Sequence, residues 1–300
     1  MALSICDTLS VLDKTGKEII QRGSSLFPAA CYLDQISLAP VPWHWHDELE
    51  IFIVMSGNAE TVVGTDKFIL HAGEGIFINS EMLHSVTALP GEECILKSIC
   101  WHAHLTGGRD DSIFWQKYTK PLIDDRTIAY IKINADTQHG LTEKSLFLDA
   151  WQQCVEEPAG YEVDVRYALS KILISLMEHE NTNYRHRGEK AMRNEERLKK
   201  MLSLIHLHYG EPLTISQIAD TASISVSEAI RCFKSTLETS PIQYVKKYRL
   251  EKALAMMDTG LTISEIGNKC GFDDMSYFGK EFRKMYGASP SEWRKDHSKV

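Results

Sequence analysis

The chain has 300 residues, of which 43% are hydrophobic and 25% charged, and its formal net charge is -8. This length and composition predict a globular protein of two domains with sizeable cores. No apolar run approaches the roughly 18 residues of a membrane span, and the N-terminal residues lack the pattern of a secretory signal. The seven cysteines are never spaced as CxxC. They argue against a disulfide framework or a zinc ribbon and favour a reducing cytoplasm.

The charge is unevenly distributed along the chain. Residues 1–194 hold 17 Lys and Arg against 27 Asp and Glu, whereas residues 195–300 hold 16 against 14. Only the C-terminal third is therefore suited to face a polyanion, and its small positive balance is by itself weak support for a nucleic-acid partner.

Between about Phe27 and Trp101 the chain consists of short β-prone segments separated by glycine. Closely spaced strands of this length predict an antiparallel sandwich or barrel, which we assign together with the N-terminal arm to residues 1–105. The expected strands lie within residues 31–39, 49–57, 58–64, 67–73, 75–80, 84–89 and 93–102.

After residue 105 the apolar spacing becomes helical. Residues 143–157 and 164–180 each place apolar side chains on one helix face, and the sequence PAGY between them predicts a turn. The resulting hairpin, within residues 106–180, either covers the barrel or supplies a dimer surface. The polar residues 181–194 are expected to form a linker.

An internal repeat follows the linker. Two segments of about thirty residues, beginning at Leu213 and Leu261, align with one insertion. Each begins with a capping-box pattern, Thr214 with Gln217 and Thr262 with Glu265, which predicts the start of a short helix.

Each copy continues through a turn of small residues into a second, amphipathic helix. That helix has a central aromatic, Phe233 or Phe282, with a cation two residues earlier, Arg231 or Lys280. Helix, tight turn and helix with outward cations is typical of a helix-turn-helix reader of the DNA major groove. Residues 240–260 join the copies as one helix, so both reading helices can enter successive grooves about 34 Å apart.

The segments RCFK, YRLEKALAMM and ISEIGNKCGFDDMSYFGKEFRKMYGASPSEWR resemble the AraC/XylS family of bacterial transcription regulators, over about residues 195–296. The N-terminal region is similar to the cupin-like sensor of many members. The resemblance implies an α+β protein in which a cupin-like antiparallel β-barrel and a helical hairpin precede an all-α double helix-turn-helix domain, residues 195–298. It further implies a cytoplasmic, ligand-responsive homodimer that binds promoter DNA and RNA polymerase and no membrane.

The same resemblance assigns the DNA contacts position by position. The expected base-reading residues are Ser227, Ile230 and Arg231 in the first copy, and Met275, Ser276, Gly279 and Lys280 in the second. Cations around them are expected to contact phosphates, which set register without reading sequence; they are Lys234, Lys246, Lys247, Arg283, Lys284 and Arg294.

Four nearby positions depart from the family pattern, and one further cation has a different expected role. Glu228 and Ala229 stand where an aromatic and a leucine are usual. Ile230 is apolar at a reading position, and Gly267 replaces a common alanine. Arg249 lies beside apolar residues of the connecting helix, so we expect it to hold the two copies together.

The stretch PWHWHDELE contains the other notable motif. His44, His46 and Glu50 fall at the spacing of the first cupin motif, and His84 fits the second. Three imidazoles and a carboxylate suit Zn²⁺, Fe²⁺, Ni²⁺ or Mn²⁺. This set supports an alternative function, a metal-dependent cupin dioxygenase or isomerase fused to a DNA-binding module.

The family resemblance favours a sensor over an enzyme. In that interpretation the four polar groups bind a small polar effector, such as a sugar, on which Trp43 or Trp101 would stack. No catalytic residue and no obligatory cofactor are then expected, and a divalent metal or a plain hydrogen-bonded interior remain the alternatives. The pairs His102 and His104, and His206 and His208, are assigned to no site.

Overall fold

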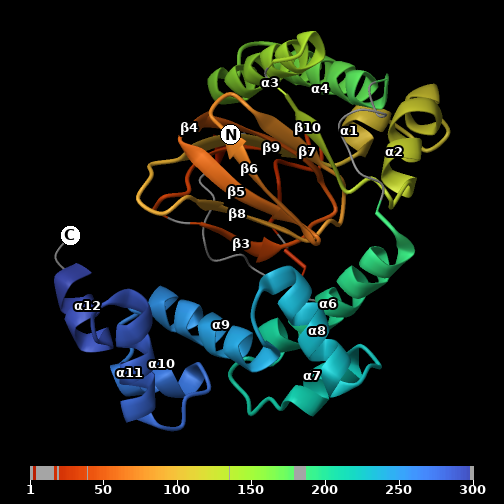
Figure 1. Ribbon diagram of the computed structural model, residues 1–300. Helices are drawn as coiled ribbons and strands as arrows, with labels where there is room; N and C mark the ends of the chain where they lie inside the picture. The colour runs from red at the N-terminus through yellow and green to blue at the C-terminus, as the bar shows by residue number, and fades with distance from the viewer. Residues whose placement is uncertain are drawn as a thin grey trace. The chain divides into compact units, whose positions relative to one another are not determined.

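The computed structural model describes residues 3–4, 17–18, 20–38, 40–134, 136–178 and 187–297. These residues form two compact units, one up to Arg193 and one from Asn194 onward. The first unit contains the strands and the second is helical (Figure 1), which confirms the expected α+β fold. Within the described ranges, no helix combines the length and the apolar character needed to cross a membrane.

The strands of the first unit form two sheets. The larger sheet has the order β1-β2-β9-β4-β7-β10 and the smaller has the order β3-β8-β5-β6. All recorded pairings are antiparallel except that of β1 with β2. The strand bounds are β1 Leu3–Ser4, β2 Ala29–Gln35, β3 Val41–His44, β4 Leu49–Ser56, β5 Asn58–Val63, β6 Asp66–His71, β7 Gly75–Ile78, β8 His84–Ala88, β9 Ile95–Trp101 and β10 Tyr130–Ile133.

The larger sheet is buried on both faces. Phe52, Val54 and Ile78 belong to a core that also takes in side chains of the smaller sheet. Ile51 and Ile53 alternate with Phe52 and Val54 along β4. They belong to a second core, which also contains side chains of the two helices within residues 138–178. This explains why β7 is buried at every position, whereas β5 alternates. The expected barrel therefore takes the form of two facing sheets.

The predicted helical hairpin consists of α3, Gln138–Glu156, and α4, Tyr161–Glu178. The two helices lie side by side over the larger sheet (Figure 1). Trp151 Nε1 donates to the carbonyl of Tyr32 at 3.0 Å, which fastens α3 to β2. The hairpin thus covers the sheet. Between β9 and α3 lie segments that the sequence did not predict: α1 His104–Gly107, η1 Trp115–Thr119, α2 Lys120–Asp124 and β10.

The second unit is built from α-helices. They are α6 Glu189–His208, α7 Ile215–Thr221, α8 Val226–Leu237, α9 Pro241–Ala255, α10 Ile263–Lys269, α11 Met275–Tyr286 and α12 Pro290–His297. Both predicted capping boxes are present, at Thr214 and at Thr262. The helix α6 begins inside the expected linker 181–194, because its first turns are rich in good helix formers such as Glu, Lys, Ala and Met. Residues 181–186 lie outside the described part of the chain.

The two repeat copies are α7–α8 and α10–α11, and α9 connects them. Arg249 of α9 donates to three backbone carbonyls, those of Tyr209 (2.7 Å), Glu211 (2.7 Å) and Gly271 (2.8 Å). Gly271 has φ +77°, and a Cβ there would come within 2.8 Å of the Tyr209 oxygen, so this turn requires glycine. The expected structural role of Arg249 is confirmed.

Candidate effector site and nucleic-acid interface

The structure brings His44, His46, Glu50 and His84 together in the first unit. His44 ends β3 and pairs in register with His84, which begins β8 of the smaller sheet. Glu50 extends from β4 of the larger sheet, and His46 lies in the loop between β3 and β4. One ligand atom from each of the four side chains lies within 4.8 Å of the others. Residues up to 40 positions apart in sequence therefore form one polar group.

Each imidazole of this group is oriented by a backbone carbonyl. The Nδ1 atoms of His44, His46 and His84 contact carbonyl oxygens, and a carbonyl can only accept, so each Nδ1 carries the hydrogen. This leaves Nε2 unprotonated in each neutral ring, and hydrogen bonds from the other ring nitrogen orient metal-binding histidines in the same way. The acceptors are, in the same order, Pro42 (2.9 Å), Glu48 (3.1 Å) and Met82 (2.8 Å).

The carboxylate of Glu50 faces these ring nitrogens. Its Oε2 lies 3.3 Å from His46 Nε2 and 3.1 Å from His84 Nε2. His84 Nε2 is fully buried without a hydrogen-bond partner. Oε2 is thus shared between two imidazole nitrogens. In the tautomer with hydrogen on Nδ1, lone pairs of both nitrogens face the carboxylate, and a cation between them would satisfy all three groups.

The protonation states agree with that requirement. Burial, aided by the neighbouring His84, lowers the pKa of His44 to about 3. Burial, together with the positive charge of Arg22, also lowers the pKa of His46. Burial acts to raise the pKa of Glu50, but the adjacent imidazoles of His46 and His84 hold that pKa well below its usual value. Neutral imidazoles and an ionised carboxylate are the forms that bind metals.

An ion-pair network that sequence reasoning missed supports the group. Arg22 is buried and pairs with Glu18 and, at 3.1 Å, with Glu48. Glu48 in turn provides the carbonyl that orients His46. The backbone N–H of Glu18 donates to the carbonyl of Trp45 at 3.1 Å, which places this N-terminal stretch beside the motif. Nothing in the spacing of Glu18 and Arg22 points to the barrel, so only the fold reveals them.

The two tryptophans that were expected to stack on the effector differ in burial. Trp101 is fully buried and belongs to the core between the larger sheet and the hairpin, so the prediction that it lines the effector site is wrong. The register explains this: Cys100 is the partner of Glu50, and Trp101 alternates to the opposite face of β9. Trp43 is half-buried and directly precedes His44 on β3, so a contact between Trp43 and the effector stays a prediction.

A divalent metal fits the four residues. Three Nε2 atoms and one carboxylate oxygen match the donors of first-row divalent sites, whose bonds measure about 2.0–2.2 Å. Because the donor atoms already lie within 4.8 Å of one another, binding requires each to move by less than about 1 Å. Buried apolar side chains such as Phe52, Ile76 and Leu70 form the core between the two sheets.

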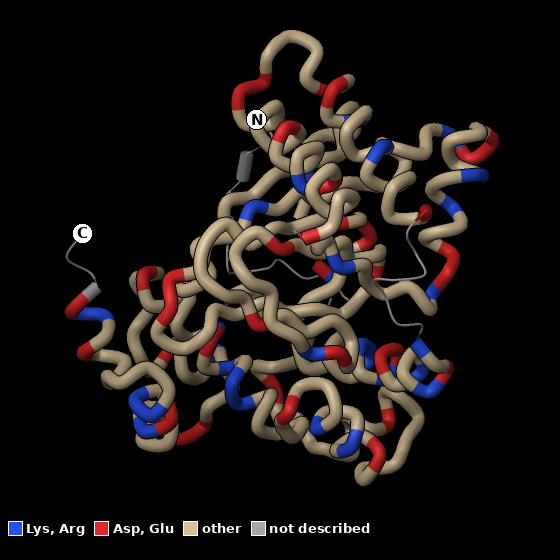
Figure 2. The backbone as a smooth tube through the Cα atoms, turned by 45° about the horizontal axis from the view of Figure 1, so that its top comes forward, with Lys and Arg blue, Asp and Glu red and all other residues tan. Residues whose placement is uncertain are grey.

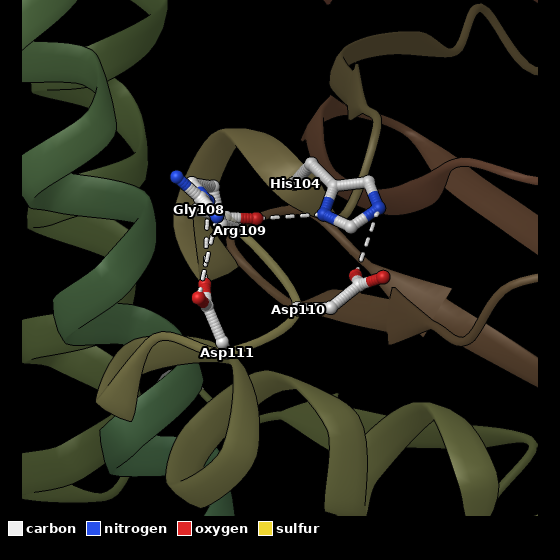
Figure 3. Close-up of a pocket in the computed structure, with 5 residues that line it drawn as sticks. All are labelled: His104, Gly108, Arg109, Asp110 and Asp111. Carbon is white, nitrogen blue, oxygen red and sulfur yellow. Dashed lines mark hydrogen bonds and ion pairs between the residues drawn. The ribbon is translucent and has the colours of Figure 1, made fainter.

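A second polar group lies on a shallow surface depression at the end of α1, shown in Figure 3. His104 Nδ1 donates to the carbonyl of Gly108 at 2.7 Å, and its Nε2 lies 3.7 Å from Asp110. Arg109 pairs with Asp111 at 3.3 Å. These groups are largely exposed and satisfy one another, so we assign them no ligand.

The reading helices α8 and α11 present most of the expected DNA-contacting residues to solvent. Ser227, Arg231 and Lys234 of α8, and Ser276, Lys280 and Arg283 of α11, are exposed, while Ile230 and Gly279 are partly exposed. Figure 2 shows Lys and Arg positions interspersed with Asp and Glu positions along the backbone of this unit.

Met275 does not present its side chain freely to DNA. It packs against the core of the second copy, and its Sδ lies 2.7 Å from where a Cβ of residue 267 would be. The absence of a Cβ at Gly267 leaves room for this thioether. Met275 is only partly buried, so base reading by this residue stays a prediction. Its packing explains the unusual glycine.

Several cations of the second unit already have carboxylate partners. Arg231 pairs with Glu228 three residues earlier, and Arg283 pairs with Glu292 of α12 at 2.8 Å. Lys246 of α9 pairs with Glu281 of α11 at 2.6 Å. This ion pair connects two helices, so the ammonium group of Lys246 is already engaged within the protein. Lys280 is exposed on α11.

Known proteins match both units. Residues 36–102 match the family described as "Cupin domain", and residues 218–296 match "Helix-turn-helix domain". The HTH-type transcriptional regulator YdeC of Bacillus subtilis is 27% identical over 292 residues, which cover 96% of this chain and 99% of that protein. The melibiose operon regulatory protein of Escherichia coli is 23% identical over 84% of this chain and 83% of its own. A crystal structure of ToxT from Vibrio cholerae aligns with 91% of this chain and 99% of its own, at a TM-score of 0.44 and 13% identity.

A cupin domain followed by a helix-turn-helix domain defines a DNA-binding transcription regulator with an N-terminal effector domain. The chain is such a regulator, and its repeat resembles the AraC/XylS family.

Proposed function

We propose that this regulator senses its effector at the group formed by His44, His46, Glu50 and His84, and that a divalent metal ion is part of that site. One observation supports this most: three carbonyl-anchored imidazoles direct Nε2 lone pairs at an ionised carboxylate within 4.8 Å. The bound metal would supply an open coordination position for a polar effector. Arg22 and Glu48 would keep His46 aligned.

The output of this sensing is the binding of promoter DNA by α8 and α11. We propose Arg231 and Lys280 as the principal base-reading residues, because both side chains are exposed on a reading helix and Arg or Lys recognises guanine O6 and N7. The protein then acts in the cytoplasm with RNA polymerase and performs no catalysis. The hairpin would supply the homodimer contact, since Val163 and Tyr167 of α4 are 70% and 63% exposed.

The metal is tested on the full chain after any affinity tag has been removed. Elemental analysis is expected to find close to one first-row metal per chain, and stripping the metal is expected to lower the melting temperature. Re-addition of Zn²⁺, Ni²⁺ or Mn²⁺ at 100 times its Kd would restore about 2.7 kcal/mol. His84→Ala should lose the metal, whereas His104→Ala, which changes an exposed histidine outside the group, should keep it.

Two outcomes would contradict the proposed metal. One is wild-type protein without stoichiometric metal and without a melting response to any of these ions. The other is equal metal content in the wild type and His84→Ala. In either case direct recognition of an organic effector becomes the better explanation. The name of the melibiose operon relative makes melibiose the first compound to test by calorimetry.

A further inference from the structure

An acidic residue of the first reading helix, Glu228, contacts two arginines, one on the same helix and one on α6. Glu228 lies in the first turn of α8, where its Oε2 accepts from Arg231 Nη2. Its other oxygen, Oε1, lies 3.5 Å from Nη1 of Arg197 on α6. The carboxylate therefore bridges a helix of the domain scaffold and the cation that we propose to read a base.

Burial and capping fix the position of this carboxylate. The Glu228 side chain is 28% exposed and that of Arg197 is 29% exposed, whereas Arg231 is 73% exposed. The N–H of Glu228 donates to Oγ of Ser225, the N-cap of α8, at 3.2 Å. The next residue, Ala229, is fully buried, which sets the rotation of the helix about its axis. Of the two arginines, only Arg231 is exposed enough to contact a ligand.

The arrangement leaves the arginine able to recognise a base. A guanidinium has five N–H donors, and the contact with Glu228 occupies one of them. The others remain for a bidentate contact with guanine O6 and N7. Holding the Arg231 guanidinium in one orientation reduces the conformational freedom that this side chain loses on binding. The Glu228 carboxylate, close to the DNA major groove, would also repel phosphates and other acceptors.

We infer that Glu228, held by Arg197, is a positioning residue that orients Arg231 for base recognition and thereby sets the sequence specificity of the first reading helix. This inference rests on the proposed base-reading role of Arg231. The simpler interpretation is an ordinary helix-surface ion pair, which contributes little even to stability. The second arginine, from a different helix, and the partial burial of Glu228 favour the positioning role.

The experiment begins with the wild-type chain and a pool of random DNA duplexes, from which a preferred operator is selected. Dissociation constants are then measured for that operator, for every single-base-pair variant of it, and for an unrelated duplex. The variants compared are Glu228→Gln, Arg197→Gln and Arg231→Ala. Glu238→Gln removes the same charge from the C-terminal end of α8 and is the matched control.

Arg231→Ala is expected to lose discrimination at one base pair, by about 5- to 150-fold, the range of one good bidentate contact. Glu228→Gln is expected to lose at least fivefold discrimination at the same base pair while its affinity for unrelated DNA stays equal or rises. Arg197→Gln should show a smaller loss at that base pair. Glu238→Gln should leave the pattern unchanged, and all four variants should melt within a few degrees of the wild type.

The outcomes separate the two proposals. If Arg231→Ala keeps full discrimination at every base pair, the proposed reading role of Arg231 is wrong. If Arg231→Ala loses it and Glu228→Gln keeps it within twofold, the reading role stands and the positioning role of Glu228 is overturned. Equal weakening on all duplexes, or the same change in Glu238→Gln, would also overturn it, because charge or fold would then explain the effect.

Discussion

The two helix-turn-helix copies share an architecture and differ in the chemistry of their reading faces. Both begin with a capping box and both bury a central phenylalanine, Phe233 or Phe282. The first copy presents an arginine held by a carboxylate on its own helix. In the second copy, the acidic neighbour of Lys280, Glu281, is tied to Lys246 of the connecting helix.

This difference suggests a division of labour. A guanidinium fork that is fixed in orientation suits the planar edge of one base, whereas an ammonium on a flexible stem acts as a point charge that accepts several geometries. The same fold can therefore provide one stringent and one tolerant contact. The comparison teaches that a repeated scaffold does not imply a repeated readout.

The largest effect is expected where the copies are joined. Arg249→Ala removes three hydrogen-bond donors. Three backbone carbonyls then lose their partner, two in the segment before the first copy and one in the turn of the second. We expect the DNA-binding unit to lose about 2–4 kcal/mol of stability, because unsatisfied backbone acceptors are costly. Thermal unfolding followed by circular dichroism measures this. Arg249→Lys should recover only part of the loss, and a full recovery would show that charge alone is required.

The next effect concerns the two cations themselves. Arg231→Ala and Lys280→Ala should each weaken promoter binding, by about 1–3 kcal/mol if each contacts a guanine. We expect the larger and more base-specific loss for Arg231→Ala. Gel-shift titrations at fixed salt measure it, while the melting temperatures should hardly change, since both side chains are exposed. Equal losses of specificity would remove the proposed difference between the copies.

The smallest effect compares the small residues at the equivalent positions Ala219 and Gly267. Ala219→Gly should lower stability by about 1 kcal/mol through helix propensity. Gly267→Ala should not gain the same amount, because the new Cβ would lie 2.7 Å from Met275 Sδ and must displace that side chain. Urea unfolding of both variants measures the asymmetry. A gain of a full 1 kcal/mol in Gly267→Ala would mean that Met275 moves at no cost.

Much of this architecture follows from local sequence signals. Strand alternation, glycine turns, helical spacing and the two capping boxes predicted the sheets, the hairpin and the repeated helix pairs. Arg249 was also predicted to be structural, because it is a cation among apolar neighbours on a connecting helix. Each of these signals lies within one element or between neighbouring ones.

The features that the sequence did not predict depend on register and on distant contacts. Trp101 lies beside Cys100, and only the pairing of β9 with β4 decides which of the two faces Glu50. Arg22 and Glu18 reach the histidine group from a segment with no repeat or motif of its own. The packing of Met275 over Gly267 joins two helices through space, so a family pattern applied position by position assigned it to DNA.

The three hydrogen bonds of Arg249 have a consequence for the DNA itself. They fasten the turn of the second copy to the segment before the first, so the offset between α8 and α11 is built into the protein. One inserted base pair moves the far half of a binding site by about 3.4 Å and turns it by about 35° around the duplex axis. Such an insertion takes one contact surface out of reach, so natural binding sites of this regulator should vary in base identity far more readily than in length.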